Sequence, residues 1–162
     1  MSGITINVGM ADLKVTTSPN ALTTIGLGSC IGIALYDQKA KVAGLAHIML
    51  PNSKDAVSAV NPAKFADTAV DTLVREMVLI GANPRALSAK IAGGAQMFNF
   101  DAANDNLRVG DRNIEATKLV LRAHRIPIIG EETGATFGRS VTIYADDGRF
   151  VIKAIGQEVR TL

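Results

Sequence analysis

Apolar and polar side chains alternate along the first fifty residues in the way that β-strands require. Short stretches rich in Ile, Val, Thr and Leu are separated by Gly, Asp or Pro, which is typical of strands connected by turns. The predicted strands cover residues 5–8, 13–16, 22–27, 30–36 and 41–50. A polar loop is expected to begin at Pro51.

The spacing of apolar residues changes to that of a helix after residue 60. Asn61 is a favourable N-cap and Pro62 a favourable first helical residue. One apolar stripe follows at helical spacing, formed by Ala66, Ala69, Val70, Leu73, Val74, Met77 and Val78. Asp71 and Arg75 are four residues apart and are expected to pair on the exposed side. The helix is predicted to end near Gly81.

The second half of the chain predicts a strand, a helix and a final hairpin. The strand covers Leu87–Ile91, and a polar loop over residues 101–106 separates it from a helix over about 112–125 with Asp111 as its cap. Two strands, 140–145 and 150–155, then close the chain around an Asp-Gly turn, which is a strong hairpin signal.

Many strands at hairpin spacing with two long helices predict an α+β layered domain rather than a regular βαβ array. The 162 residues fit a single domain, 1–162, in which a core can be buried. Aromatic residues make up only 4% of the chain, so the core is expected to consist of aliphatic side chains.

Charge and cysteine content exclude several classes of function. The net charge is +2 without a Lys/Arg cluster, which argues against nucleic-acid binding and against a membrane-binding surface. The single cysteine, Cys30, excludes an intramolecular disulfide and a zinc site built on several thiolates. The N-terminus lacks the pattern of a signal peptide, and no apolar run reaches the roughly 20 residues that span a bilayer. We therefore expect a soluble, cytoplasmic protein.

Cys30 is the first candidate for chemistry, because it follows the small residues of Gly26-Leu27-Gly28-Ser29 at the start of an apolar strand. Glycines allow a substrate to approach the backbone closely. Taken alone, however, a cysteine in this context is more often a small buried apolar residue.

His47 makes the catalytic interpretation of Cys30 stronger. A hairpin turn centred between Gln38 and Lys39 would place Tyr36 opposite Lys41 and Cys30 opposite His47, with both side chains on one face of the sheet. The inference depends on register, since a slip of one residue separates the two faces. A hydrogen-bonded core histidine remains the alternative for His47.

A thiol next to an imidazole fits nucleophilic catalysis because the thiolate is the reactive form. A neighbouring His is expected to lower the pKa of the thiol, and its other ring nitrogen then needs an orienting acceptor. Asp, Asn, a Thr hydroxyl or a backbone carbonyl can serve as that acceptor.

Other polar features give weaker signals. Gly93-Gly94 lacks the spacing and the Lys of a phosphate-binding loop. Asp146 and Asp147 lie in a turn where Asp is favoured without a metal. His124 is expected near a helix C-terminus, where it favours the helix dipole rather than catalysis.

Several motifs together resemble the chemoreceptor glutamine deamidase family, CheD. The most specific are Thr24-Ile25-Gly26-Leu27-Gly28-Ser29-Cys30 and Ala46-His47-Ile48-Met49-Leu50-Pro51. Further matching segments are residues 64–70, 90–98, 109–113 and 133–140, so the resemblance covers most of the chain. One departure is Ala135, where the family's Thr-Gly-Gly pattern has a second glycine.

The resemblance implies a catalytic triad of Thr24, Cys30 and His47, within a layered α/β/β sandwich of mostly antiparallel strands that carries two long helices on the outside. It implies that a glutamine side chain of a methyl-accepting chemotaxis receptor is converted to glutamate through a Cys thioester. Backbone N–H groups at Gly28, Ser29 and Cys30 are expected to hold the oxyanion or the substrate. No metal or organic cofactor is required, and a CheC-type phosphatase is an expected partner.

Two alternatives to catalysis stay open. The protein could be a non-enzymatic adaptor that docks on chemoreceptors or on a CheC-type phosphatase, with Cys30 incidental. It could also be a thiol redox sensor, which would need Cys30 but not His47.

Overall fold

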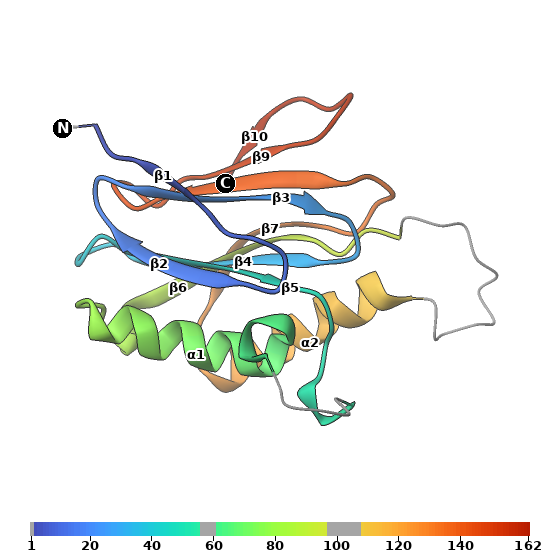
Figure 1. Ribbon diagram of the computed structural model, residues 1–162, viewed down its shortest axis with the longest axis horizontal. Helices are drawn as coiled ribbons and strands as arrows, with labels where there is room; N and C mark the ends of the chain where they lie inside the picture. Colours follow the sequence, from blue (N-terminus) through green and yellow to red (C-terminus); the bar gives the residue numbers. More distant parts are fainter. Residues whose placement is uncertain (1, 56–60, 97–107) are drawn as a thin grey trace.

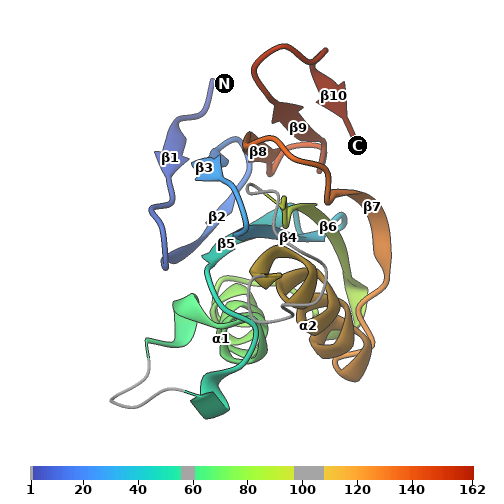
Figure 2. The same ribbon diagram turned by 90° about the vertical axis from the view of Figure 1, so that its right-hand side faces the viewer.

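Two five-stranded sheets and a pair of helices form three layers in the computed structural model, which describes residues 2–55, 61–96 and 108–162. The helices cover one face of the middle sheet, and the second sheet covers its other face (Figures 1 and 2). The α/β/β sandwich expected from the family resemblance is therefore confirmed. The polar loop predicted at 101–106 lies outside the described residues.

The outer sheet has the strand order β1-β3-β8-β9-β10, and the middle sheet has the order β2-β5-β4-β6-β7. The outer strands are β1 (Thr5–Asn7), β3 (Ala21–Leu27), β8 (Arg139–Tyr144), β9 (Phe150–Lys153) and β10 (Arg160–Thr161). The middle strands are β2 (Leu13–Thr17), β4 (Ile31–Asp37), β5 (Val42–Ile48), β6 (Leu87–Gly93) and β7 (Ile128–Thr133). The helices are α1 (Ala66–Leu79) and α2 (Val109–Ala123), with short 3₁₀ turns η1 (Ser53–Asp55), η2 (Pro62–Lys64) and η3 (Pro84–Ala86).

The middle sheet is covered on both faces, which explains why its central strands have nearly continuous apolar sequences. Every residue of β4 and β5 is buried. Side chains that point toward the helices, such as Ile33 and Ile48, pack with Leu73 and Leu121. Those on the opposite face pack between the two sheets.

The two strands of the β4–β5 hairpin were predicted correctly, but their predicted register was wrong. Gly32, not Cys30, lies directly opposite His47, and Tyr36 lies opposite Ala43. The loop has four residues because the Asp37 carboxylate accepts hydrogen bonds from the amides of Lys39 and Ala40, both at 3.0 Å. A two-residue turn over Gln38-Lys39 would need positive φ angles, which these residues disfavour. The register differs by two residues, so every side chain keeps its predicted face.

The predicted helix caps are displaced. The Asn61 side chain caps η2, accepting a hydrogen bond from the Ala63 amide at 3.1 Å, and α1 begins after it at Ala66. Asp111 lies inside the first turn of α2 rather than at its cap, because that helix starts three residues earlier than predicted. The predicted pair of Asp71 and Arg75 is present at 3.6 Å.

Two strands were not predicted. β7 follows α2 and pairs with β6 in parallel, and β10 is a two-residue edge strand beside β9. Parallel pairing requires a crossover, here α2, so it leaves no local turn signal in the sequence. The final hairpin is confirmed, since β8 and β9 pair antiparallel around Asp147-Gly148.

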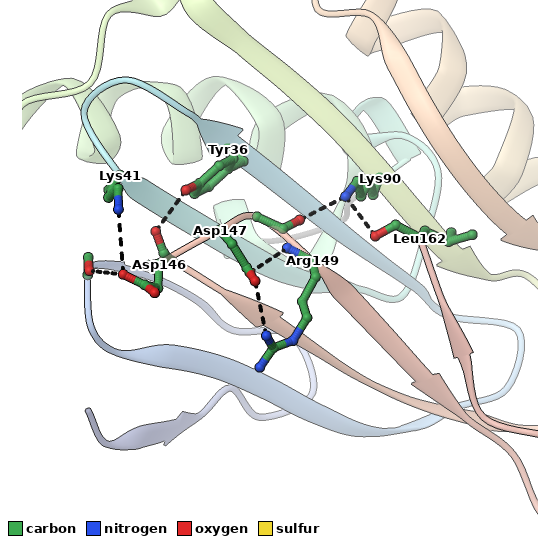
Figure 3. A network of polar contacts seen from close by, with 10 residues as sticks. Tyr36, Lys41, Lys90, Asp146, Asp147, Arg149 and Leu162 are labelled. Atoms are coloured by element: carbon green, nitrogen blue, oxygen red, sulfur yellow. Dashed lines mark hydrogen bonds and ion pairs between the residues drawn. The ribbon is translucent and has the colours of Figure 1, made fainter. Parts of the chain in front are cut away.

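Lys90 ties the middle sheet to the outer sheet. Its Nζ donates hydrogen bonds at 2.8 Å to the main-chain oxygens of Gly148 and Leu162 (Figure 3). Nearby, the Tyr36 hydroxyl donates to the Ala145 carbonyl at 2.9 Å. Both donors come from the middle sheet, so they hold the β8–β9 turn against it. None of the described helices is long and apolar enough to cross a membrane.

Candidate active site

The segments that carry Thr24, Cys30 and His47 meet at one end of the sandwich, where β3 and β5 end and β4 begins (right-hand side of Figure 1). The pairing of β3 with β8 shifts register between Thr24 and Leu27. Gly26 within this irregularity has a φ of +76°, a conformation that favours glycine. The bulge therefore separates Thr24, inside the sheet, from the loop that leads to Cys30.

Thr24 and His47 are in direct contact although they belong to different sheets. The hydroxyl oxygen of Thr24 lies 2.7 Å from Nδ1 of His47 and 2.7 Å from the carbonyl oxygen of Val8. Thr24 and His47 are both completely buried.

These two contacts fix the tautomer of the imidazole. A carbonyl oxygen only accepts, so the single hydroxyl proton of Thr24 is donated to Val8. The Thr24 oxygen must then accept a hydrogen bond from Nδ1–H of His47. Nε2 consequently carries the free lone pair, and it has no hydrogen-bond partner within the described ranges. A buried imidazole in this state is a base with its acceptor nitrogen unused.

Cys30 lies immediately before β4, in the buried cluster between the two sheets. Gly32 is opposite His47, and Cys30, two residues before Gly32 and just outside β4, therefore lies diagonal to His47 on the same face. The direct opposition expected from the sequence is thus replaced by a diagonal one. The thiol is not hydrogen-bonded to Nε2 in the described structure.

Burial shifts the pKa values of both groups toward their neutral forms. It raises the pKa of the Cys30 thiol, against a smaller opposite effect of that residue's own backbone amide. It also lowers the pKa of the His47 imidazole. The expectation that His47 lowers the thiol pKa is therefore wrong for this state. Both shifts favour the neutral thiol and the neutral imidazole.

The loop before Cys30 is held by the segment that follows β6. The Gly94 amide donates to the Cys30 carbonyl at 2.8 Å, and the Ala95 amide donates to the Gly28 carbonyl at 2.9 Å. A Cβ atom on Gly93 would lie 2.2 Å from the Cys30 carbonyl oxygen, which requires a glycine there. Gly93-Gly94 thus supports the cysteine loop, and its amide at Gly94 is already used.

The amides expected to hold an oxyanion are only partly free. The Gly28 amide donates to the Gly26 carbonyl at 3.1 Å, so it is already used. The amides of Ser29 and Cys30 donate to no other residue in the described part of the chain.

Sequence reasoning missed Val8 and Asn113. Val8 acts through its main-chain carbonyl, which no side-chain pattern reveals. Asn113 is completely buried on α2 and hydrogen-bonds to main-chain atoms beside Cys30 and His47. The sequence signal for Asn113 is an amide side chain on the buried face of the helix, which it shares with Gly110, Thr117 and Leu121.

Comparison with known proteins places the chain in a family. The family model described as "CheD chemotactic sensory transduction" matches residues 49–154. The chain belongs to the CheD family. Thr24, Cys30 and His47 all lie before the matched segment, but the alignments with the two relatives described next cover 94–96% of this chain and extend over all three residues.

Two curated CheD relatives are similar over nearly their whole length. The "Probable chemoreceptor glutamine deamidase CheD" of Caldanaerobacter subterraneus subsp. tengcongensis is 54% identical over 155 residues, 96% of each chain. The "Chemoreceptor glutamine deamidase CheD" of Halalkalibacterium halodurans is 48% identical over 153 residues, 94% of each chain. Among solved structures, the hypothetical protein YfiH of Bacillus licheniformis is 16% identical, with a TM-score of 0.49 over 77% of this chain and 51% of that chain.

Proposed function

We propose that this CheD-family chain deamidates glutamine side chains of chemoreceptors, with Cys30 as nucleophile, His47 as base and Thr24 as the residue that orients His47. The observation that carries the proposal is the Thr24–His47 contact. It leaves Nε2 unprotonated, on the face shared with Cys30, and without a partner among the described residues. The names of the CheD relatives supply the substrate class.

The first half of the reaction transfers the acyl group to sulfur. Cys30 loses its proton to Nε2 of His47 while Sγ bonds to the carboxamide carbon of the glutamine. The negative charge moves to the carboxamide oxygen. The amides of Ser29 and Cys30, which donate to no other described residue, are suited to bind it. The tetrahedral intermediate collapses as His47 returns the proton to the nitrogen, ammonia leaves and a thioester remains.

The second half restores the enzyme. Nε2 of His47 takes a proton from water, whose oxygen attacks the thioester carbon. The C–S bond breaks, Sγ receives the proton and glutamate is released. Cys30 is 7% exposed whereas Thr24 and His47 are fully buried, so the substrate meets the thiol first and the base lies behind it.

A second binding partner is proposed from the family resemblance alone. In addition to the chemoreceptor, which is the proposed substrate of this chain, a CheC-type phosphatase is proposed to bind it. In the adaptor alternative these two contacts are the entire function, and the buried Thr24–His47 pair has no role in it. A redox sensor likewise gives no role to an oriented imidazole.

Mass spectrometry of a receptor cytoplasmic fragment incubated with the protein tests the proposal. A gain of about one mass unit at particular glutamines is expected, because NH₂ is replaced by OH. Cys30→Ala should abolish this gain and the release of ammonia while the variant still binds the fragment. Unchanged receptor signalling with Cys30→Ala would instead support the adaptor function.

A further inference from the structure

Asn113 connects the segment of the nucleophile to the segment of the base. Its Nδ2 donates one hydrogen bond to the carbonyl oxygen of Ser29 and another to that of Met49, both at 2.9 Å. Both partners only accept, so the side-chain nitrogen, not the oxygen, must face them. One amino group therefore spans the residue before Cys30 and the second residue after His47.

We propose that Asn113 is a positioning residue that sets the relation between Cys30 and His47. This inference rests on the proposed catalytic pair and adds a third element, helix α2, to the site. The main-chain hydrogen bonds between β4 and β5 do not join Ser29 to Met49, because Ser29 lies before β4 and Met49 lies after β5. The Asn113 side chain takes the place of that pairing.

The hydrogen bond to Ser29 also orients the amide of Cys30. In a trans peptide the carbonyl and the following N–H point in opposite directions. Because the Ser29 carbonyl faces α2, the Cys30 N–H faces away from the helix. Asn113 thus fixes the direction of one of the two amides that are suited to bind the oxyanion.

Close approach of α2 depends on Gly110, one turn before Asn113. A Cβ atom there would lie 2.5 Å from the Ala95 carbonyl oxygen and 2.7 Å from that of Gly94. Gly94 and Ala95 in turn donate to the loop that ends at Cys30. The helix and the cysteine loop therefore pack against the same two residues, which fixes the distance that the Asn113 side chain must span.

The orphaned oxygen of Asn113 argues against a purely stabilising role. Its Oδ1 is buried and has no hydrogen-bond partner among the described residues. Burying an unpaired acceptor reduces the free energy of unfolding, so stability alone does not favour Asn at this position. The side chain is explained by its two donated bonds.

Thr117 provides a matched control. It lies four residues further along the same buried face of α2, is equally buried, and its hydroxyl is also without a partner in the described ranges. It makes no hydrogen bond to the segments of Cys30 or His47. Thr117→Val keeps the shape of the side chain while removing only the hydroxyl.

Alkylation of Cys30 by iodoacetamide tests the role without any receptor. The rate is measured near pH 6 for Asn113→Ala and Thr117→Val, each with His47 intact and with His47→Ala, after circular dichroism has shown a native fold. We expect Asn113→Ala to slow alkylation at least tenfold when His47 is present and to have no further effect when His47 is absent. Thr117→Val should leave both rates unchanged.

The possible outcomes separate the two proposals. Equal effects of Asn113→Ala in both backgrounds would mean that the side chain only shields or exposes the thiol, and would overturn the positioning role. An unchanged rate for Asn113→Ala, with His47→Ala slow, overturns this inference but preserves the catalytic pair. An unchanged rate for His47→Ala overturns both. If Asn113→Ala does not fold, Asn113→Ser retains one donor, and an intermediate loss that again depends on His47 is expected.

Discussion

The hydroxyl oxygen of Thr24 lies 2.7 Å from Nδ1 of His47, across the boundary between the outer and the middle sheet. Because the same hydroxyl donates its proton to Val8, the contact selects one tautomer of His47. Thr24 therefore determines which nitrogen of His47 carries the proton as well as how the imidazole is oriented.

Replacement of Thr24 should lower turnover with little change in receptor affinity, because the hydroxyl contacts the base and not the substrate. Thr24→Ala removes one hydrogen bond and leaves Nδ1 without an acceptor, so we expect a loss of roughly tenfold in kcat. The loss should be smaller than that of Cys30→Ala, since the nucleophile remains. Steady-state kinetics of ammonia release give kcat and the KM for the receptor fragment, which tests both expectations.

Thr24→Ser is the matched control, because it retains the hydroxyl and should keep most of the activity. Nitrogen chemical shifts of His47 give an independent readout of its tautomer. Full activity in Thr24→Ala would show that the side chain does not orient the base, although the backbone of Thr24 could still contribute.

The alkylation rate of Cys30 should be almost independent of pH between the lowered pKa of His47 and the raised pKa of the thiol. In that interval the thiolate forms by internal proton transfer to Nε2, so its population does not depend on free protons. Without the imidazole, the thiolate population falls about tenfold for each pH unit below the thiol pKa.

His47→Ala should therefore react more slowly than the wild type in mildly acidic solution, and the difference should narrow as the pH rises toward the thiol pKa. Rates of iodoacetamide modification over a pH series measure this. Parallel pH profiles for the two proteins would show that the imidazole does not receive the proton.

Asp37 should make stability depend on pH in the acid range. Burial raises the pKa of this carboxyl, but hydrogen bonds from the amides of Ala40, Asn83 and Lys39 outweigh it, so the pKa is lowered overall. The stabilisation is fully present above the unfolded pKa of about 4 and is lost as the pH falls through the folded value. Asp37→Asn should reduce the free energy of unfolding by about 2 kcal/mol at pH 7.

Urea denaturation at pH 7 and at pH 3 distinguishes this effect from loss of packing. The difference between wild type and Asp37→Asn should shrink at the lower pH. A difference of equal size at both values would mean that the charge of Asp37 is not responsible.

Ala135→Gly should stabilise the protein slightly. Ala135 has a φ of +61°, in the left-handed region that costs a residue with a Cβ roughly 1–2 kcal/mol. Glycine removes this cost but loses more conformational entropy on folding, so the net gain should be about 0.5 kcal/mol. Ala123→Gly, at an exposed helical position, should have the opposite sign. Thermal unfolding of both variants measures the two effects.

How far the sequence predicts this structure is clearest at the β4–β5 hairpin. The two-residue period of a strand determined that Cys30 and His47 share a face, and this was confirmed even though the register was wrong. The offset of two residues depends on how Asp37 folds the turn, which the strand pattern does not contain. β7 was missed because its partner, β6, is reached only through α2. In addition, the adjacent charged residues Glu131, which is exposed, and Glu132, which is largely buried, conceal its alternation.

The polar contacts of the site were harder to predict than its side chains. Thr24, Cys30 and His47 follow from motifs, whereas the Val8 carbonyl and the Asn113 side chain are brought to them by packing between layers. Such contacts join residues that are distant in sequence, so only the assembled sandwich reveals them.

The Thr24–His47 contact joins one strand from each sheet. The activity proposed for the protein therefore depends on the packing of the two sheets against each other. A compact state that kept both sheets but let them slide apart would have normal far-ultraviolet circular dichroism and no oriented base. Deamidation should therefore disappear at the first loosening of the sandwich, at lower denaturant concentrations than the loss of secondary structure. Catalytic assays would then detect a separation of the two sheets that far-ultraviolet circular dichroism does not detect.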